Sequence, residues 1–195
     1  MENNVIIRAA SLEDAPRLSE IYSYYILKTA VSFEYDPPIA EEFAGRMAST
    51  MDKFPYLVAE ADGTVIGYAY AQQLGLRSAY RYSVELSIYL DRDARGAGVG
   101  RALYERMEEA LRVQGMHNLY ADIARPVSAD DPYLTHASLR FHEAMGFVPN
   151  GVFSRCGYKF SRWYDTVWME KIIGTHDTEP RELLSCSEVY ALCGL

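Results

Sequence analysis

The hydrophobic pattern of the chain changes its period within one central stretch, residues 84–107. Residues 84–90 alternate apolar and polar side chains, which is typical of a strand with two different faces. Residues 91–95 are too polar to belong to a core. From Arg101 onward apolar side chains recur three or four positions apart, so we expect a helix that ends near Gly115. The stretch therefore predicts a strand, a polar turn and an amphipathic helix in succession.

The same two patterns recur on both sides of this stretch. Ser11, with Asp14 three residues later, is typical of a helix start. Asp62 and Gly63 form a hairpin signal between two apolar segments. Further strands are expected at residues 5–9, 56–60, 64–71, 119–123, 148–153 and 163–171, and further helices from Ser11, from Ile39 and over residues 138–145.

Length and element order predict one layered unit. A chain of 195 residues fits a single domain with a sizeable core, and mixed strands and helices predict an α/β or α+β fold. We place this domain at residues 1–173. Residues 174–195 are expected to form a C-terminal tail with weak helical character, and residues 125–135 an irregular loop.

Composition narrows the class of protein. Hydrophobic content of 49% and charged content of 24% are ordinary for a soluble globule. A formal net charge of −8 argues against a nucleic-acid partner. No signal-peptide-like segment and no run of eighteen apolar residues is present, so we expect no membrane partner and a cytoplasmic location. The three cysteines have no metal-ligand spacing and are interpreted as free thiols, and no metal site is expected.

The polar turn carries glycine at every second position, Gly96, Gly98 and Gly100, between Arg95 and Arg101. A helix start leaves backbone N–H groups unpaired and carries the positive end of the helix dipole. Glycines let an anion approach those groups, and the two arginines add full charge. The pattern indicates a phosphate or diphosphate site, although a flexible glycine-rich turn is the structural alternative.

Three kinds of phosphate-binding loop are candidates for this turn. A P-loop requires a lysine that is missing here. A dinucleotide fingerprint requires a third glycine where Arg101 or Leu103 stands, although Asp122 lies where a ribose-binding acid is expected. The third candidate is the acyl-CoA loop of the GNAT N-acetyltransferases, which residues 95–100 match at every fixed position.

The chain resembles the GNAT family well beyond this loop. Five blocks occur in the order found in the phosphinothricin and methionine sulfoximine acetyltransferases, and the similarity covers nearly all of residues 5–172. The blocks are residues 21–38 (IYSYYILKTAVSFEYDPP), 83–90 (SVELSIYL), 95–100 (RGAGVG), 141–147 (FHEAMGF) and 157–165 (GYKFSRWYD). The resemblance implies a mostly antiparallel sheet, flanked by helices, that splays at its fourth and fifth strands. Acetyl-CoA is expected in that opening as cosubstrate.

Acetyl transfer to an amine requires a base, because most amines are protonated at neutral pH. Glu85 is a lone carboxylate in an apolar strand ten residues before the loop, where an apolar wall would raise its pKa into a useful range. The branch carries its proposed base at the matching place, acting directly or through a water. The structural alternative is a solvated or arginine-paired glutamate.

The leaving thiolate and the thioester oxygen require donors. His142 lies where many GNAT enzymes have a tyrosine that acts as general acid, and the branch that this chain resembles has histidine there. A purely structural role for this histidine is an alternative of equal weight. The backbone N–H groups of residues 88–90 would stabilise the oxygen if the strand bulges.

The resemblance also implies binding residues. Thr135 stands where the family has asparagine, a departure, and the loop before it is longer than the family's usual turn. Arg81 and Tyr82 replace an Asp-Trp pair found in some phosphinothricin enzymes. The expected cofactor contacts are Ile88, Tyr89, Leu90, Arg95, Gly96, Ala97, Gly98, Val99, Gly100, Arg101, Thr135 and Ser138, and the expected acceptor pocket is Phe33, Arg77, Tyr80, Tyr104, Tyr158 and Lys159.

The sequence thus predicts an acetyl-CoA-dependent N-acetyltransferase that acts on the α-amine of a small amino-acid-like acceptor by direct transfer in a ternary complex. Phosphinothricin, methionine sulfoximine and methionine sulfone are the acceptors that the resemblance implies, and the branch typically forms homodimers. The alternatives are a GNAT enzyme for another amine (a protein N-terminus, a polyamine or an aminoglycoside), a non-catalytic acyl-CoA sensor, and a dinucleotide-binding protein.

Overall fold

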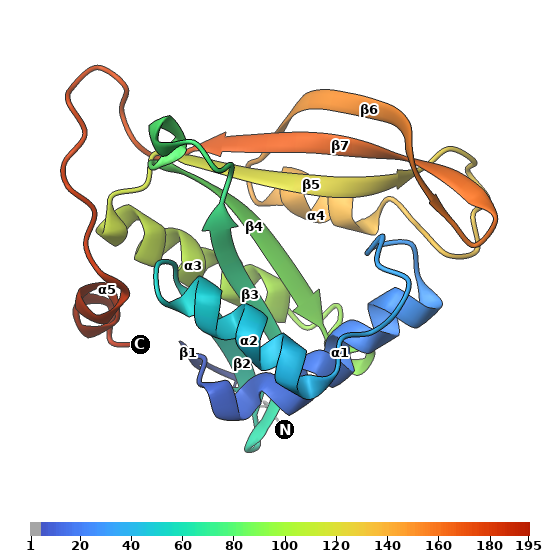
Figure 1. Cartoon of the computed structure of the whole chain (residues 1–195), viewed down its shortest axis with the longest axis horizontal. Helices are drawn as coiled ribbons and strands as arrows, with labels where there is room; N and C mark the ends of the chain where they lie inside the picture. Colours follow the sequence, from blue (N-terminus) through green and yellow to red (C-terminus); the bar gives the residue numbers. More distant parts are fainter. Residues whose placement is uncertain (1–4) are drawn as a thin grey trace.

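The computed structural model describes residues 5–195 and contains one mixed sheet flanked by helices (Figure 1). Single 3₁₀ turns occur at Leu12–Asp14, Ser78–Tyr80 and Arg92–Ala94. The strands are β1 (Val5–Ala9), β2 (Tyr56–Ala61), β3 (Thr64–Gln73), β4 (Ser83–Leu90), β5 (Asn118–Pro126), β6 (Val148–Lys159) and β7 (Arg162–Ile172), and the helices are α1 (Ala15–Lys28), α2 (Ala40–Met51), α3 (Val99–Gln114), α4 (Ala137–Ala144) and α5 (Cys186–Cys193).

The sheet has the strand order β1-β2-β3-β4-β5-β7-β6, and its neighbours are antiparallel except for β4 and β5. The parallel pairing of β4 with β5 extends only from Ser83 opposite Asn118 to Glu85 opposite Tyr120. Both strands continue beyond that point, but they no longer pair with each other. The expected splay between the fourth and fifth strands is therefore present, and it begins directly after Glu85.

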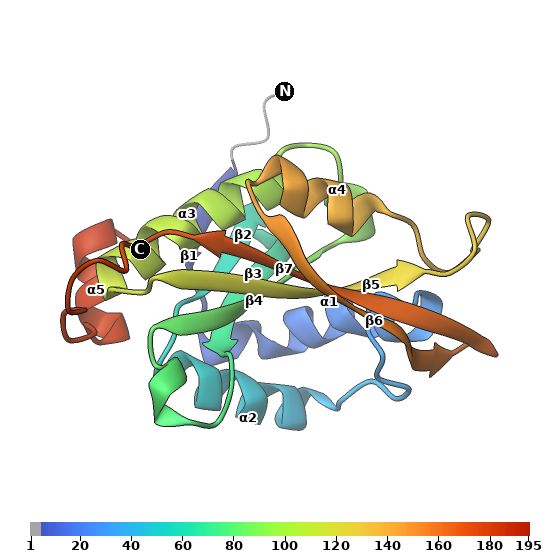
Figure 2. The ribbon, with the colours of Figure 1, turned by 90° about the horizontal axis from the view of Figure 1, so that it is seen from above.

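Helices cover both faces of the sheet. Figure 2 shows α3 and α4 on one side of the strands and α1 and α2 on the other. Side chains of β4 alternate between these layers: Leu86 packs in the core beneath α3, whereas Tyr89 packs against the core formed with α1 and α2. The period of two that the sequence shows over residues 84–90 thus separates two cores.

Tyr25 of α1 closes part of the splay. Its hydroxyl donates a hydrogen bond to the carbonyl oxygen of Leu90 (2.7 Å) and accepts one from the N–H of the same residue (3.1 Å). Unpaired backbone groups are costly away from water. The tyrosine hydroxyl therefore replaces the ladder partner that β5 would otherwise supply.

Two strands are longer than the sequence pattern predicts. The pattern ends the sixth strand at Phe153, whereas β6 continues to Lys159 after a bulge at which Arg155 has a φ of 50°. The bulge shifts the alternation of side chains, which explains why the second half of the strand was missed. β5 likewise runs to Pro126, beyond the expected end at residue 123.

The C-terminal residues pack against the C-terminal half of α3. Val189 is fully buried, the Tyr190 hydroxyl accepts a hydrogen bond from the Tyr56 N–H (3.0 Å), and Arg106 donates one to the Cys193 carbonyl (2.7 Å). The turn at Gly98 begins the opposite end of this helix. The segment 174–195 thus lies far along α3 from the glycine-rich turn.

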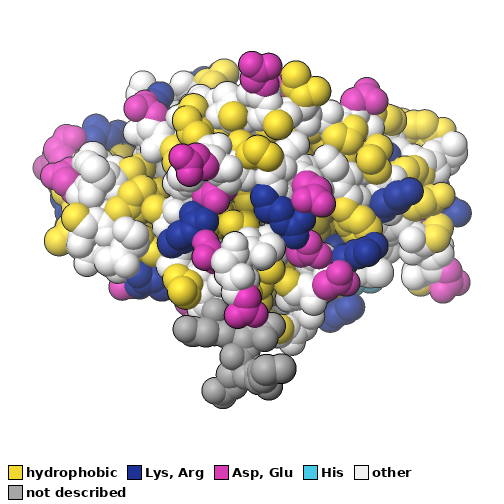
Figure 3. All heavy atoms as spheres, turned by 90° about the horizontal axis from the view of Figure 1, so that it is seen from below, with side chains coloured by type: hydrophobic (Ala, Val, Ile, Leu, Met, Phe, Trp, Pro, Cys, Tyr) yellow, Lys and Arg dark blue, Asp and Glu magenta, His cyan; other side chains and the backbone are white. Residues whose placement is uncertain are grey.

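The outer surface carries charges of both signs. Figure 3 shows basic and acidic side chains interspersed with apolar ones on the face seen from below. Charged side chains of the described residues also form ion pairs, such as those of Arg8 with Asp14 (2.8 Å) and of Arg17 with Glu20 (2.7 Å). Among the described residues no helix is long and apolar enough to cross a bilayer.

Replacing Tyr25 by phenylalanine should destabilise the protein, because both polar groups of Leu90 lose their partner. We expect a loss of about 1–3 kcal/mol in the free energy of unfolding, measured by urea denaturation. Tyr24→Phe is the matched control, since within residues 5–195 no hydrogen bond from the Tyr24 hydroxyl occurs. Equal stability of the two variants would contradict the role assigned to Tyr25.

Candidate active site

The glycine-rich turn presents an open start of α3. Gly96 and Gly98 have φ of +81° and +82°, in the left-handed region that favours glycine, and a Cβ at either position would meet no atom within 4 Å. The first helical hydrogen bond runs from the Ala102 N–H to the Gly98 carbonyl (3.0 Å), so the N–H groups before Ala102 have no partner within the helix. These amides and the positive end of the helix dipole make the turn a suitable anion site.

Two arginines flank this turn. The guanidinium of Arg95 lies over the rings of Tyr24 and Tyr25, 5.6 and 5.1 Å from their centroids. Arg101 lies one turn into the helix, with Glu105 3.5 Å away. Since both arginines are at the surface of the same turn, they add positive charge where the free amides converge.

A cleft of about 60 Å³ lies where β4 and β5 part. Because Leu90 turns both its N–H and its carbonyl away from β3, the alternation of an antiparallel ladder also turns the polar groups of Ile88 away from β3, into the unpaired region. The Leu90 N–H is already bonded to Tyr25, so Ile88 retains the N–H directed into the cleft. The lining residues are Val31, Leu86, Ser87, Ile88, Tyr89, Tyr104, Ala121, Asp122, Ile123, Ala124, Leu134, Ser138 and His142.

Glu85 is half-buried at the last paired position before the splay. Burial raises the pKa of its carboxyl, the neighbouring carboxylate of Asp122 raises it further, and a hydrogen bond from Gln72 lowers it. No ion pair to Glu85 occurs among residues 5–195, so the arginine-paired alternative is absent from the structure. A carboxyl with a raised pKa beside a cleft has the properties of a general base.

His142 is buried, and its two ring nitrogens are both engaged. Nδ1 lies 2.8 Å from the Ser138 carbonyl, to which it must donate, and Nε2 lies 2.9 Å from the Tyr104 hydroxyl. The Nε2 atom is then the acceptor, and the proton between the two side chains belongs to Tyr104. Burial lowers the pKa of His142 to about 4, so the imidazole is neutral at neutral pH.

The six residues expected to form the acceptor pocket lie in three separate places. Tyr104 alone lines the cleft. Arg77 and Tyr80 lie in the connection between β3 and β4, where Tyr80 packs on Gly75. Phe33, Tyr158 and Lys159 lie where the α1–α2 loop meets the β6–β7 hairpin. Phe33 contacts Gly157, and the Tyr158 ring packs against that of Trp163 at a tilt of 54°. The buried Lys159 ammonium donates to the Ser32 carbonyl (2.6 Å).

The two residues expected on the coenzyme arm also differ in their surroundings. Ser138 lines the cleft, whereas Thr135 is exposed, and its hydroxyl accepts a hydrogen bond from the Ala137 N–H (3.2 Å) at the start of α4. Within residues 5–195 no cluster of three or more His, Cys, Asp or Glu side chains is arranged to hold a metal.

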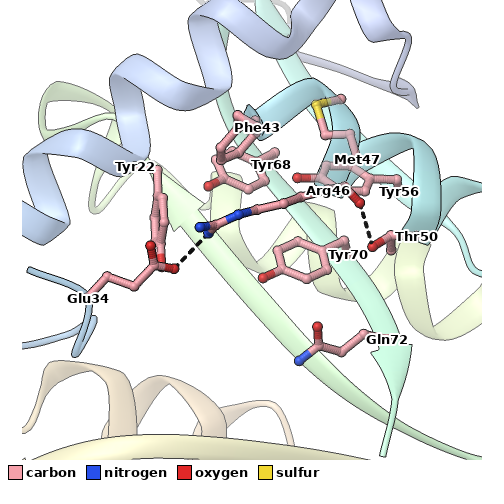
Figure 4. Close-up of a pocket in the computed structure, with 10 residues that line it drawn as sticks. All are labelled: Tyr22, Glu34, Phe43, Arg46, Met47, Thr50, Tyr56, Tyr68, Tyr70 and Gln72. Carbon is pink, nitrogen blue, oxygen red and sulfur yellow. Dashed lines mark hydrogen bonds and ion pairs between the residues drawn. The ribbon is translucent and has the colours of Figure 1, made fainter. Parts of the chain in front are cut away.

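A larger cavity, missed by the sequence reasoning, lies beneath α2. This tyrosine cavity has a volume of about 320 Å³ and is shown in Figure 4. The alternation of Tyr68 and Tyr70 in the third strand was the available signal, because two large polar-tipped side chains on one face of an inner strand need a shared space. Its lining residues are Tyr22, Glu34, Phe43, Arg46, Met47, Thr50, Tyr56, Tyr68, Tyr70 and Gln72.

A splayed sheet with an anion-binding turn at the head of its central helix defines a class of acyltransferase folds. A family model described as an acetyltransferase (GNAT) domain matches residues 7–168. The chain belongs to the GNAT acetyltransferase family, as its glycine-rich turn indicated.

Two individual relatives and one solved structure are similar to this chain over most of its length. A phosphinothricin N-acetyltransferase of Alcaligenes faecalis is 38% identical over 173 residues, covering 88% of this chain and 84% of that protein. A methionine sulfoximine/methionine sulfone acetyltransferase of Salmonella typhimurium is 30% identical, covering 87% and 95%. The crystal structure of a phosphinothricin acetyltransferase from Sinorhizobium meliloti in complex with AcCoA superposes with a TM-score of 0.82 at 35% identity, over 91% of this chain and 94% of that one.

The neutral state of His142 should make stability depend on pH. Its folded pKa of about 4 lies below the unfolded value of about 6.5, so its contribution is complete above pH 6.5 and is lost as pH falls toward 4. We expect wild type to lose about 3 kcal/mol more than His142→Gln across this range. Denaturant unfolding at several pH values measures the difference. His136→Gln, at an exposed histidine, should retain the wild-type slope, and a wild-type slope in His142→Gln would refute the assignment.

Proposed function

We propose that this protein is an acetyl-CoA-dependent N-acetyltransferase acting on the α-amine of a small amino-acid-like acceptor. Phosphinothricin, methionine sulfoximine and methionine sulfone are the acceptor types that the names of its relatives support. The observation that carries the proposal is the position of Glu85, a half-buried carboxyl at the point where β4 and β5 part. Direct transfer in a ternary complex is the simplest course, since the lining of the cleft includes no cysteine.

The residues of the turn and cleft fit acetyl-CoA. Residues 95–101 would hold its diphosphate, because Gly96 and Gly98 leave room above the free amides. Ile88, Tyr89, Leu90 and Ser138 would line its acyl arm. The bound cosubstrate supplies an acetyl group activated as a thioester. Of the three strand residues, Ile88 has the N–H that is positioned to stabilise an oxyanion.

Glu85 accepts a proton from the acceptor's ammonium group, directly or through one water. Its raised pKa brings the carboxylate closer to the amine in proton affinity than an exposed glutamate would be. Gln72, the cross-strand partner of Glu85, lowers the pKa of this carboxyl and so helps to keep it available as a base. The protein thereby provides the neutral amine that attack requires.

Tyr104 takes the proton-donating role that the resemblance gives to His142: its hydroxyl proton passes to the leaving thiolate, and the second proton that the amine loses as the amide forms restores the hydroxyl. Tyr104 carries the proton that lies between the two side chains, and it lines the cleft. His142, fixed by the Ser138 carbonyl, orients the hydroxyl without storing a proton. In this proposal His142 is a positioning residue.

We further propose that two copies associate through β6 and β7 in the cytoplasm. β6 is the edge strand of the sheet, with one side of its backbone unpaired. The apolar side chains of this hairpin are exposed, including Phe153 at 58% and Trp163 at 55%. An apolar surface along an edge strand is a common association surface.

Glu85→Gln should lower kcat/KM by about a hundredfold to ten-thousandfold, because the base is removed with little change of shape. The wild-type rate should rise with pH through an acid limb that lies above the usual pKa of a glutamate, since burial raises the Glu85 pKa. The variant should lack this limb. Thiol release from acetyl-CoA with methionine sulfone measures both. Glu143→Gln, at an exposed glutamate, is the control. Equal profiles for wild type and Glu85→Gln would remove Glu85 from the mechanism.

Phe153→Glu should convert a dimer into a monomer, because it places a charge in the proposed apolar contact. Light scattering after size-exclusion chromatography measures the mass. Leu76→Glu introduces the same charge at a fully exposed site away from the hairpin and should leave the mass unchanged. A monomeric wild type would overturn the dimer.

A further inference from the structure

Two residues that line the tyrosine cavity are next to Glu85 and the cleft across the β3–β4 pairing. Gln72 lines the cavity and is the cross-strand partner of Glu85 in the pairing of β3 with β4. Tyr70 lines it too and is the cross-strand partner of Ser87, which lines the cleft. A molecule whose amine lies at Glu85 therefore has the cavity within reach of its remaining atoms. The cavity lies between α2 and the strands β2 and β3, apart from all six residues of the expected acceptor pocket.

Three tyrosines form one wall of the cavity. Tyr56 and Tyr70 stack with ring centroids 5.0 Å apart and planes at 13°, and Tyr68 and Tyr70 lie 6.3 Å apart at 11°. In Figure 4 the Arg46 side chain extends across these rings toward Glu34, with Tyr70 below it. No side-chain hydrogen bond within residues 5–195 uses the hydroxyl of Tyr56 or Tyr68. The wall thus combines flat apolar faces with hydroxyl groups that lack a protein partner.

The charged residues of the cavity are already paired with each other. Arg46 donates to Glu34 (2.8 Å) and to Glu42 (2.7 Å), and Tyr22 donates a further hydrogen bond to Glu34 (2.9 Å). The deep wall of tyrosines has no charge of its own. An ionic side chain entering the cavity would therefore lose water without gaining an unpaired counter-charge, which is strongly unfavourable. An uncharged side chain has no such cost.

We infer that this cavity receives the acceptor's side chain and selects amino acids with an uncharged aromatic side chain. The inference rests on the proposed function and specifies its acceptor. A volume of about 320 Å³ is in the range of small-molecule pockets and leaves room beyond a short side chain. The parallel rings offer stacking surfaces, and the free hydroxyls suit the polar edge of a phenol or indole. Phosphinothricin, which is anionic, is then a poorer acceptor for this protein than the name of the Alcaligenes faecalis relative suggests.

The test compares acceptors of different charge and size. Initial rates of thiol release from acetyl-CoA are measured with L-tryptophan, L-tyrosine, methionine sulfone, phosphinothricin and L-arginine. We expect kcat/KM for the aromatic acceptors to exceed that for phosphinothricin and arginine by at least about tenfold. Turnover of methionine sulfone or phosphinothricin without turnover of aromatic acceptors would overturn this inference alone. Absence of turnover with every acceptor would overturn the proposed function as well.

Thr50→Phe fills the cavity without touching Glu85, Tyr104 or the turn. Thr50 is partly exposed on α2 and lines the cavity, so a larger side chain there takes space from the acceptor. We expect KM for L-tryptophan to rise about tenfold or more, with less than a twofold change for methionine sulfone. Ser49→Phe, on the exposed side of the same helix, is the matched control.

A second, smaller substitution at Thr50 keeps the test decisive if Thr50→Phe does not fold. Thr50→Leu should raise KM for L-tryptophan by an intermediate factor, and circular dichroism reports whether each variant is folded. A uniform loss for all acceptors in folded Thr50→Phe, or no loss for tryptophan, would contradict the assignment of the cavity to the acceptor's side chain.

Discussion

Two neighbouring strands that run parallel and then part are the constraint on which the rest of this structure depends. Beyond Glu85 and Tyr120, β4 and β5 leave backbone N–H and carbonyl groups without ladder partners. Such groups must find other partners or face a ligand. The Tyr25 hydroxyl bonds to the N–H and the carbonyl of Leu90, whereas the N–H of Ile88 faces the cleft. The opening is therefore both the weakest point of the sheet and the place where its backbone can bind something else.

The electrostatics of the site follow from partial burial. Glu85 and Asp122 face the same region without a cation, so each carboxyl has a raised pKa and the ionised form of Glu85 is further disfavoured by its neighbour. His142 and Tyr104 lie on the other side of the cleft and exclude water, which keeps the imidazole neutral. In the proposed mechanism, proton acceptance and proton donation fall to two groups that differ in chemistry and lie against different elements.

Two segments outside the cleft, residues 174–195 and the β6–β7 hairpin, pack against other parts of the fold. Residues 174–195 pack on α3 near Arg106 and Gln114, where Leu184 donates its N–H to the Gln114 carbonyl (3.0 Å). This contact stabilises the end of the helix whose other end carries the glycine-rich turn. The turn end of the β6–β7 hairpin brings Lys159 against the loop that follows α1.

The sequence by itself determined the elements whose signals are local. These signals depend on neighbours within a few positions; they are the alternation over residues 84–90, the glycines at 96 and 98 and the apolar repeat after Arg101. The five sequence blocks, which occur in the family's order, identified the family. Only the tertiary structure decided that Gln72 lies opposite Glu85, that His142 is neutral, and that three tyrosines line a cavity. The physical reason is that burial, pairing and cavity shape arise from segments distant in the chain, and no local pattern of side chains records which of them will meet.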